Sequence, residues 1–450
     1  MSTASEAMFE GRANLGHTLF PELAAAGMTH DQQLKFARFR FWRVLLPVAL
    51  WYSFYYLGRL NWGISLPWII QDLGINKFQA GIGEAALFWG YAAATFFAGR
   101  ASDRFGARLL QVFGGIGTTV MNVLVALQSS VAGVLLFMWG NGLVQGLASA
   151  PTSRMNAQWY PRARRGFANG VFVMSFSLST LAAWGITGYT VANYGWRAAF
   201  TWPLLIFVLP TTIALFFLVR DKPQDAGFPP YKEPDEDTVS TRAEALSDDE
   251  VKGAKAWLIL LKDWGFMANC GAAFMTYIGR FALLTWVPLY WAETSGLKLK
   301  EIPFMTFALP LGMILGPFIA GVISDKLFNA MRYQVVIGYL VCAIGCLLLM
   351  AFIPIQTMGL VWSMTLLFFS GFFILGVIGS QWTLAMDSGA RKLAGTAVGL
   401  YNGFNYLGAA SSGILMGGIL HLSDNSWSLA FSTVAALLGV GALLMFLARR

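Results

Sequence analysis

The chain has 450 residues, of which 56% are hydrophobic and only 12% are charged, and its formal net charge is +8. Soluble domains contain about 25% charged residues, so this composition excludes a soluble globular protein and indicates an integral membrane protein. Because lipid offers backbone groups no hydrogen-bond partners, apolar runs of about 20 residues without alternating polarity predict helices. The positive charge comes from short loops and does not indicate nucleic-acid binding.

The chain divides into four parts. Residues 1–41 are predicted to form a polar cytoplasmic tail, with partial helix at the membrane surface. Two bundles of six spans, at 42–220 and 263–450, are separated by a cytoplasmic linker at 221–262, whose prolines and mixed charge are typical of a flexible segment. The twelve expected spans are 42–68, 79–99, 107–128, 131–153, 166–189, 197–219, 263–291, 301–324, 333–354, 358–384, 394–416 and 427–448.

Basic residues are distributed unevenly between the two sides of these spans. If both termini face the cytoplasm, 25 of the 31 lysines and arginines lie on the cytoplasmic side or at the cytoplasmic end of a span. The opposite side has four, Lys77, Arg197, Lys298 and Lys300, and two more lie within the membrane. Short cytoplasmic loops are enriched in Lys and Arg. The count therefore predicts cytoplasmic termini in a multi-pass protein, and we expect it in the cytoplasmic (inner) membrane of a bacterium.

Two arginines inside apolar segments define the candidate site. Arg59 lies in YSFYYLGRLNWGISLP, and Arg280 lies 221 positions further on, in TYIGRFALLTWVP. A tyrosine, Tyr56 or Tyr277, precedes each arginine by three residues, close to one helical turn. A charge at mid-membrane depth costs about 3 kcal/mol or more, so such residues usually face a cavity and carry function. Guanidinium groups match the oxygens of phosphate or carboxylate, which predicts an anion between the two arginines.

Further segments repeat between the two halves. GRASDRFG at 99–106 follows the second span, and GVISDKLF at 321–328 follows the eighth. Asp103 and Asp325 in these loops are 222 positions apart, and Gly166 and Gly395 both open the fifth span of their half. Parallel repeats of this kind, about an axis normal to the membrane, build one major class of transporter.

With these motifs the chain resembles the major facilitator superfamily. Five residues match the loop motif between the second and third spans of that family: Gly99, Asp103, Arg104, Gly106 and Arg108. The resemblance implies an all-α membrane protein, with twelve transmembrane helices in two pseudo-symmetric six-helix bundles, the major facilitator fold. It also implies that Asp103 and Arg104, with Asp325 and Lys326 in the second copy, are gating residues that latch loops to helix ends.

Within that superfamily the chain resembles the organophosphate:phosphate antiporters, which exchange glycerol phosphate or hexose phosphate. The matching segments are YYLGRLN (55–61), DKPQDAGFPP (221–230), YIGRFALLTWVPLY (277–290), SDKLFN (324–329) and AGTAVGLYNGFNYLG (394–408). The resemblance implies that Arg59 and Arg280 jointly hold the phosphoryl group of the substrate.

Two cations of the sugar-phosphate exchangers are missing from this chain. Their second-span lysine aligns with Thr95 and their fifth-span histidine with Phe176, and none of the three histidines falls within a predicted span. Glu84 lies in the second span eleven residues before Thr95, about three turns, so both can face one cavity. These departures leave room for a less charged anion than a sugar phosphate.

Other polar residues of the spans complete the expected site. The substrate-binding candidates besides the two arginines are Tyr52, Tyr56, Thr95, Asn141, Gln145, Tyr277, Asn405 and Tyr406. Asn141 and Gln145 are equally well explained by hydrogen bonds between helices. Glu84 is either a proton-coupling group or a salt-bridge partner near the outer face.

Three functions remain open from the sequence. The first is an antiporter that exchanges an organic phosphate or phosphonate for inorganic phosphate by alternating access. The second is a proton-coupled symporter of a carboxylate or another organic anion, and the third is a transporter-like sensor of a phosphorylated metabolite. No enzyme, cofactor or metal site is expected, because no nucleophile and base pair or metal-ligand cluster occurs among the spans. The expected partners are the anion, phosphate or a proton, and the bilayer, around a monomer.

Overall fold

The computed structural model describes residues 28–160, 168, 171, 174–175, 178–229, 254–327, 332–388 and 390–448. Within these ranges a few side chains are excluded, among them those of Asp103 and Asp325. The first part of the predicted tail, the middle of the predicted linker and Phe176 also lie outside the described residues. The described part of the chain is almost entirely helical and contains no strand.

The N-terminal half is a bundle of helices joined by short turns. Its α-helices are α3 (His30–Phe39), α4 (Leu46–Tyr55), α5 (Leu57–Leu73), α6 (Lys77–Phe105), α7 (Ala107–Ala126), α8 (Val131–Gln145), α9 (Ser149–Trp159), α11 (Gly188–Tyr194), α12 (Trp196–Pro203) and α13 (Leu209–Leu218). The π-helical turns η2 (Arg40–Leu45), η3 (Ala183–Thr187) and η4 (Leu204–Val208) continue three of them, and the 3₁₀ turn η5 (Pro223–Ala226) follows α13.

The C-terminal half begins after the undescribed part of the linker. Its helices are α14 (Ala254–Lys262), α15 (Trp264–Thr294), η6 (Leu299–Glu301), α16 (Ile302–Met305), α17 (Ala308–Leu327), α18 (Arg332–Phe352), α19 (Ile355–Met358), α20 (Leu360–Ser388), α21 (Ala390–Leu422) and α22 (Trp427–Leu447). Pro288 and Pro317 lie inside α15 and α17.

The helices confirm the expected all-α membrane fold. Eight described helical stretches are long and apolar enough to cross a membrane, and they coincide with eight of the twelve expected spans. The first, second, fifth and eleventh expected spans are outside this set. The first is interrupted at Tyr56, between α4 and α5, and contains Arg59. The second and eleventh form the long helices α6 and α21, and the fifth is described only in part.

One segment expected as flexible linker is helical where the structure describes it. Helix α14 (Ala254–Lys262) lies inside the predicted linker and packs against α15 and α21. Its Leu260 is buried in a cluster with Phe266 and Tyr401. The sequence WLILL supplies apolar side chains, of which Trp257, Leu258 and Leu261 stay exposed, and the burial of Leu260 stabilises a helix that polarity and proline content do not predict.

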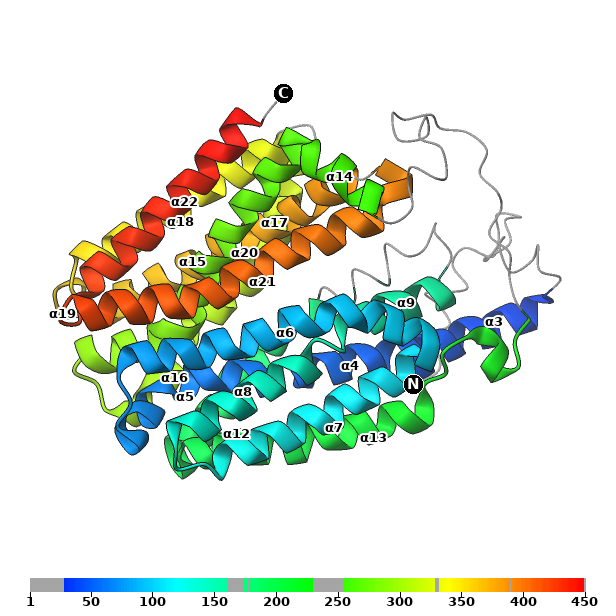
Figure 1. The fold of residues 1–450 in the computed structure, drawn as a ribbon, viewed down its shortest axis with the longest axis horizontal. Coiled ribbons are helices and arrows are strands. Elements are labelled where there is room, and N and C mark those ends of the chain that lie inside the picture. The colour runs from blue at the N-terminus through cyan, green and yellow to red at the C-terminus, as the bar shows by residue number, and fades with distance from the viewer. Residues whose placement is uncertain are drawn as a thin grey trace.

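The two halves lie side by side, with long contacts along two helix pairs and further contacts of η3 and α11 with α16. Helix α6 packs along α21, and α5 packs along α15. In Figure 1 the helices α6 and α21 lie close together at the left and diverge toward the right. We name the right side the linker end, because α3, α14 and η5 lie there, and the left side the far end.

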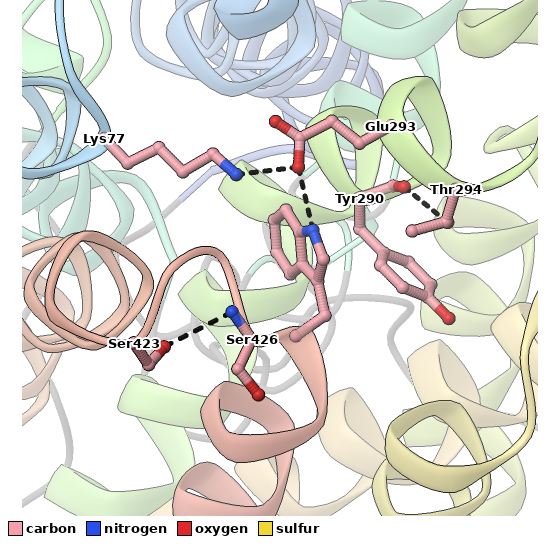
Figure 2. Close-up of polar contacts among 7 residues, drawn as sticks. Lys77, Tyr290, Glu293, Thr294, Ser423 and Ser426 are labelled. Carbon is pink, nitrogen blue, oxygen red and sulfur yellow. Dashed lines mark hydrogen bonds and ion pairs between the residues drawn. The ribbon is translucent and has the colours of Figure 1, made fainter.

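The far end is closed by direct contact between the halves. A Cβ on Gly81 of α6 would lie 2.1 Å from the carbonyl oxygen of Gly413 of α21, and one on Gly63 of α5 would lie 2.6 Å from Cα of Thr285 of α15. Figure 2 shows Lys77 at the start of α6 reaching Glu293 at the end of α15, with Nζ and Oε2 2.7 Å apart. Backbones this close leave no path between the halves at these points.

A hydrogen bond extends this ion pair within the C-terminal half. The indole Nε1 of Trp427 donates to the same Oε2 of Glu293 at 2.8 Å, and the Lys77 ammonium lies 5.0 Å from the centre of the Trp427 ring. We refer to Lys77, Glu293 and Trp427 together as the far-end latch. Its ion pair joins α6 of one half to α15 of the other.

Equivalent close contacts between a glycine and a backbone carbonyl occur in both halves. A Cβ on Gly142 would lie 2.0 Å from the carbonyl oxygen of Leu87, and one on Gly371 would lie 2.2 Å from that of Leu309. Leu309 comes 222 positions after Leu87, and Gly371 comes 229 positions after Gly142. These close helix contacts give the register of the internal repeat independently of the arginines.

Candidate functional site

Arg59 lies in the first turn of α5, three residues after the break at Tyr56 between α4 and α5. Only 4% of the residue is exposed. Its Nε donates to Oε1 of Gln145 on α8 at 3.1 Å, and its guanidinium carbon lies 3.9 Å from the centre of the Tyr56 ring and 5.0 Å from that of Tyr91. Its Nη2 is buried and has no hydrogen-bond partner among the described residues. One edge of this guanidinium is therefore left for a ligand.

Arg280 occupies the middle of the unbroken helix α15 and is 8% exposed. Its guanidinium carbon lies 5.4 Å from the centre of the Tyr277 ring and 5.3 Å from that of Phe281. Its Nε is buried without a hydrogen-bond partner in the part of the chain that the structure describes. Neither arginine forms an ion pair with a described carboxylate. A buried cation without a counter-ion is costly, and an anionic ligand would remove that cost.

Tyrosine side chains connect the two arginines across the halves. The phenol of Tyr56 interacts electrostatically with both Arg59 and Arg280, and so does the phenol of Tyr277. The ring of Tyr406 on α21 lies 6.1 Å from that of Tyr277 and 4.0 Å from that of Tyr91 on α6. Both guanidinium groups therefore border one ring of phenols contributed by both halves.

Tyr91 belongs to this ring and was missed in the sequence analysis. It lies four residues before Thr95 and seven after Glu84, so the helical period puts all three on one face of α6. That spacing is the sequence signal by which Tyr91 could have been predicted. Thr95 itself is half-buried, and its hydroxyl donates to the carbonyl of Tyr91 at 2.8 Å.

The amides of α8 have different partners. Asn141 is fully buried; its Nδ2 donates to the carbonyl of Gly58 at 2.6 Å, and its Oδ1 accepts from the Thr118 hydroxyl at 2.6 Å. Asn141 thus joins α8 to α5 and α7, which agrees with the expectation that its amide forms hydrogen bonds between helices. Gln145 is also fully buried, but it contacts Arg59 directly.

The other tyrosine and amide candidates line the same region. Tyr52 is fully buried one turn before Tyr56, and the two ring centres are 5.5 Å apart. Asn405 is fully buried on α21, beside Tyr406 in sequence, and it interacts with Tyr401 one turn earlier. The ring of its neighbour Tyr406 reaches Tyr91 of α6.

Glu84 lies between the halves on the far-end side of the arginines. It is 2% exposed, and its Oε1 accepts from the Thr285 hydroxyl of α15 at 2.5 Å. A small pocket next to it is lined by Arg59, Trp62, Glu84, Phe88, Phe281 and Thr285, among others. The described ion pairs of the far end involve other residues, Lys77 with Glu293 and Arg197 with Asp72. Glu84 therefore contacts the other half through a hydroxyl, and it lines the same pocket as Arg59.

The expected gating residues lie at the linker end, far along α6 and α17 from the site. Arg104 is exposed, with its guanidinium carbon 5.4 Å from the centre of the Phe105 ring, and Lys326 is also exposed. The side chains of Asp103 and Asp325 lie outside the described part, so their gating role stays a prediction. No group of three or more His, Cys, Asp or Glu able to hold a metal occurs among the described residues.

Comparison with known proteins places this geometry among membrane transporters. The family model described as "Major Facilitator Superfamily" matches residues 48–413. The chain is 28% identical over 431 residues to a "Probable hexose phosphate transport protein" of Chlamydia pneumoniae, covering 93% of each chain. It is 27% identical to the "Membrane sensor protein UhpC" of Salmonella typhimurium, covering 94% of this chain and 95% of that protein.

A further relative and a solved structure extend the comparison. The chain is 29% identical to the "Probable sulfoacetate transporter SauU" of Cupriavidus necator, covering 89% of this chain and 92% of that protein. The crystal structure of a bacterial homologue of the human lysosomal transporter Spinster, in an inward-facing and unoccupied conformation, superposes with a TM-score of 0.70. It covers 92% of this chain and 97% of that chain at 17% identity, a similarity of fold alone.

Proposed function

The chain belongs to the Major Facilitator Superfamily, and on that basis we propose that it exchanges a phosphorylated or phosphonate metabolite for inorganic phosphate across the membrane. The superfamily consists of transporters and not of enzymes. The observation that carries the proposal is the pair of buried guanidinium groups, one from each half, that border one ring of phenols and have no described carboxylate partner. Two such cations would balance the charge of a doubly charged phosphoryl group.

Transport proceeds by rocking of the two halves around this site, so that it opens to one side at a time. The uneven distribution of Lys and Arg supports a cytoplasmic linker end. With that orientation, the contacts of Gly81 with Gly413 and of Lys77 with Glu293 close the outer side. The structure then corresponds to an inward-facing state, and outward opening requires these contacts to separate.

A second function, proton-coupled symport of another organic anion, has its own support. Glu84 borders the same pocket as Arg59 and contacts the opposite half, as a coupling carboxylate would. Thr95 replaces a cation of the sugar-phosphate exchangers, and a relative named as a sulfoacetate transporter spans most of the chain. The similarity to UhpC keeps a sensor of a phosphorylated metabolite as a third function.

Reconstituted protein distinguishes exchange from proton symport. In proteoliposomes loaded with inorganic phosphate, we expect labelled external phosphate to accumulate by counterflow without any pH gradient. In vesicles without internal phosphate, a pH gradient alone should drive no uptake. Uptake that needs the pH gradient and ignores internal phosphate would instead support the symporter, and binding without any flux would support the sensor.

Thr95 tests whether the missing cation sets the charge of the substrate. The ring of Tyr91, one turn away, lies 5.0 Å from the Arg59 guanidinium carbon, so Thr95→Lys adds a positive charge close to the site. We expect Thr95→Lys to shift competition toward doubly charged phosphate over a simple carboxylate, because one more cation favours the more negative ligand. Thr95→Met controls for side-chain size. An unchanged preference would show that position 95 does not face the anion.

A further inference from the structure

The glycine that precedes each arginine packs against different kinds of side chain in the two halves. Gly58 and Gly279 are 221 positions apart. A Cβ on Gly58 would lie 3.0 Å from Nε2 of Gln145, while a Cβ on Gly279 would lie 3.1 Å from Cδ1 of Ile374. The side chains that face this turn are therefore polar in the N-terminal half, where Thr118 Oγ1 is nearer still at 2.6 Å, and alkyl in the C-terminal half, where Leu438 lies at the same 3.1 Å as Ile374.

The packing register of the repeat makes the two side chains equivalent. Gly371 comes 229 positions after Gly142, from their matching contacts with the second helix of each half. Ile374 comes 229 positions after Gln145. Two separate sets of contacts thus align the same pair of residues, so the difference between them is a difference in how each half supports its arginine.

Gln145 is held on both sides of its amide. Its Nε2 donates to the carbonyl of Tyr55 at 3.1 Å and to the Thr118 hydroxyl at 2.8 Å, while its Oε1 accepts from Arg59. An amide fixed in this way also fixes the guanidinium plane, because the Nε–H bond restrains the last torsions of the arginine side chain.

Ile374 offers Arg280 no such restraint. It is fully buried and has no polar atom in its side chain. The Nε of Arg280, which corresponds to the Nε that Gln145 holds in Arg59, is buried without a hydrogen-bond partner among the described residues. The Arg280 head has a side-chain hydrogen bond with Tyr277 of its own helix and lies against the Phe281 ring, but no described side chain of another helix bonds its Nε.

We propose that Gln145 is a positioning residue that makes Arg59 the stationary side of the anion site, while Ile374 leaves Arg280 free to turn with the anion between the two access states. This inference rests on the proposed anion transport. It assigns unequal roles to two arginines that the sequence presents as equals. Binding strength should depend on the restraint of Arg59, and the rate of exchange should depend on the freedom of Arg280.

Two single variants separate these roles with inorganic phosphate as the probe. Gln145→Leu should raise the phosphate dissociation constant by about ten- to a hundred-fold, because a hydrogen bond to a charged group is lost and Arg59 is released. Ile374→Gln should lower the maximal exchange rate by about tenfold, since the added amide can tether Arg280 with a bond of similar strength, and it should leave the dissociation constant within about threefold. Calorimetric titration gives the first quantity, and proteoliposome counterflow gives the second.

The double variant Gln145→Ile with Ile374→Gln exchanges the two supports. If the arginines were interchangeable, it would exchange phosphate like the wild type. We expect both defects instead. Thermal unfolding checks that each variant folds. If the Gln145 variants do not fold, the single variant Ile374→Gln still tests the proposal.

The outcomes separate this inference from the function it rests on. Wild-type protein that neither binds nor exchanges phosphate overturns the phosphate antiporter itself, and the inference with it. Wild-type exchange together with unchanged binding in Gln145→Leu, or with an unchanged exchange rate in Ile374→Gln, overturns the unequal roles alone.

Discussion

Replacement of Arg59 or Arg280 by lysine should weaken anion binding by about ten- to a hundred-fold, although each substitution keeps the positive charge. A lysine ammonium is a point charge on a flexible stem, whereas guanidinium presents a planar fork of N–H groups. Arg59 already uses its Nε for Gln145, so its two Nη groups remain for the ligand. Lysine at this position would lose at least one charge-assisted hydrogen bond to the anion.

Competition of inorganic phosphate and a simple carboxylate against bound substrate measures this effect in wild type, both lysine variants and both alanine variants. Alanine should be worse than lysine at either position, because the charge is lost as well. Arg332→Lys is the matched control, since Arg332 forms a half-exposed ion pair with Asp387 at the linker end. Full activity in both site variants would show that positive potential alone holds the substrate.

Gly81→Leu should abolish transport while binding of substrate from the outer side persists. Even a Cβ at this position would lie 2.1 Å from the carbonyl oxygen of Gly413, so a leucine holds α6 and α21 apart. Overpacking of a tight contact costs about 1 to 3 kcal/mol, and a backbone carbonyl cannot move aside as a side chain can. Overpacking raises the free energy of the state with a closed far end, so the protein should remain open at that end.

Counterflow measures the expected loss of transport. The reaction of thiol reagents with a cysteine introduced near the far end measures whether that end stays open. Gly345→Leu is the matched control, because Gly345 also lies within a long helix, α18, but a Cβ there meets no atom within 4 Å. Wild-type exchange by Gly81→Leu would mean that the transport cycle does not pass through the closed far end described here.

The central residues of the candidate site could be selected from sequence because membranes penalise charge. Arg59 and Arg280 are conspicuous in apolar segments, and a spacing of three residues is enough to assign Tyr56 and Tyr277 to them. The fold followed from span lengths, the linker and the repeat. These inferences need only local spacing and the cost of burying polar groups.

The supporting residues could not be predicted in the same way. Tyr91 is one of 14 tyrosines, and its role depends on which face of α6 meets α21. The contrast between Gln145 and Ile374 appears only after the helices are packed, because it depends on which side chain lies against the turn before each arginine. The helicity of α14 depends on a docking surface formed by α15 and α21, far away in the sequence.

In the proposed rocking cycle, the far-end latch would also shift the populations of the two access states. Its ion pair joins the halves only when the far end is closed, and the Lys77 side chain is 10% exposed there against 35% for Glu293. A pair near the surface contributes up to about 1 kcal/mol, which corresponds to roughly a fivefold change in population. At rest the site would then be presented more often to the linker side, and the solute first captured in each cycle would come from that compartment.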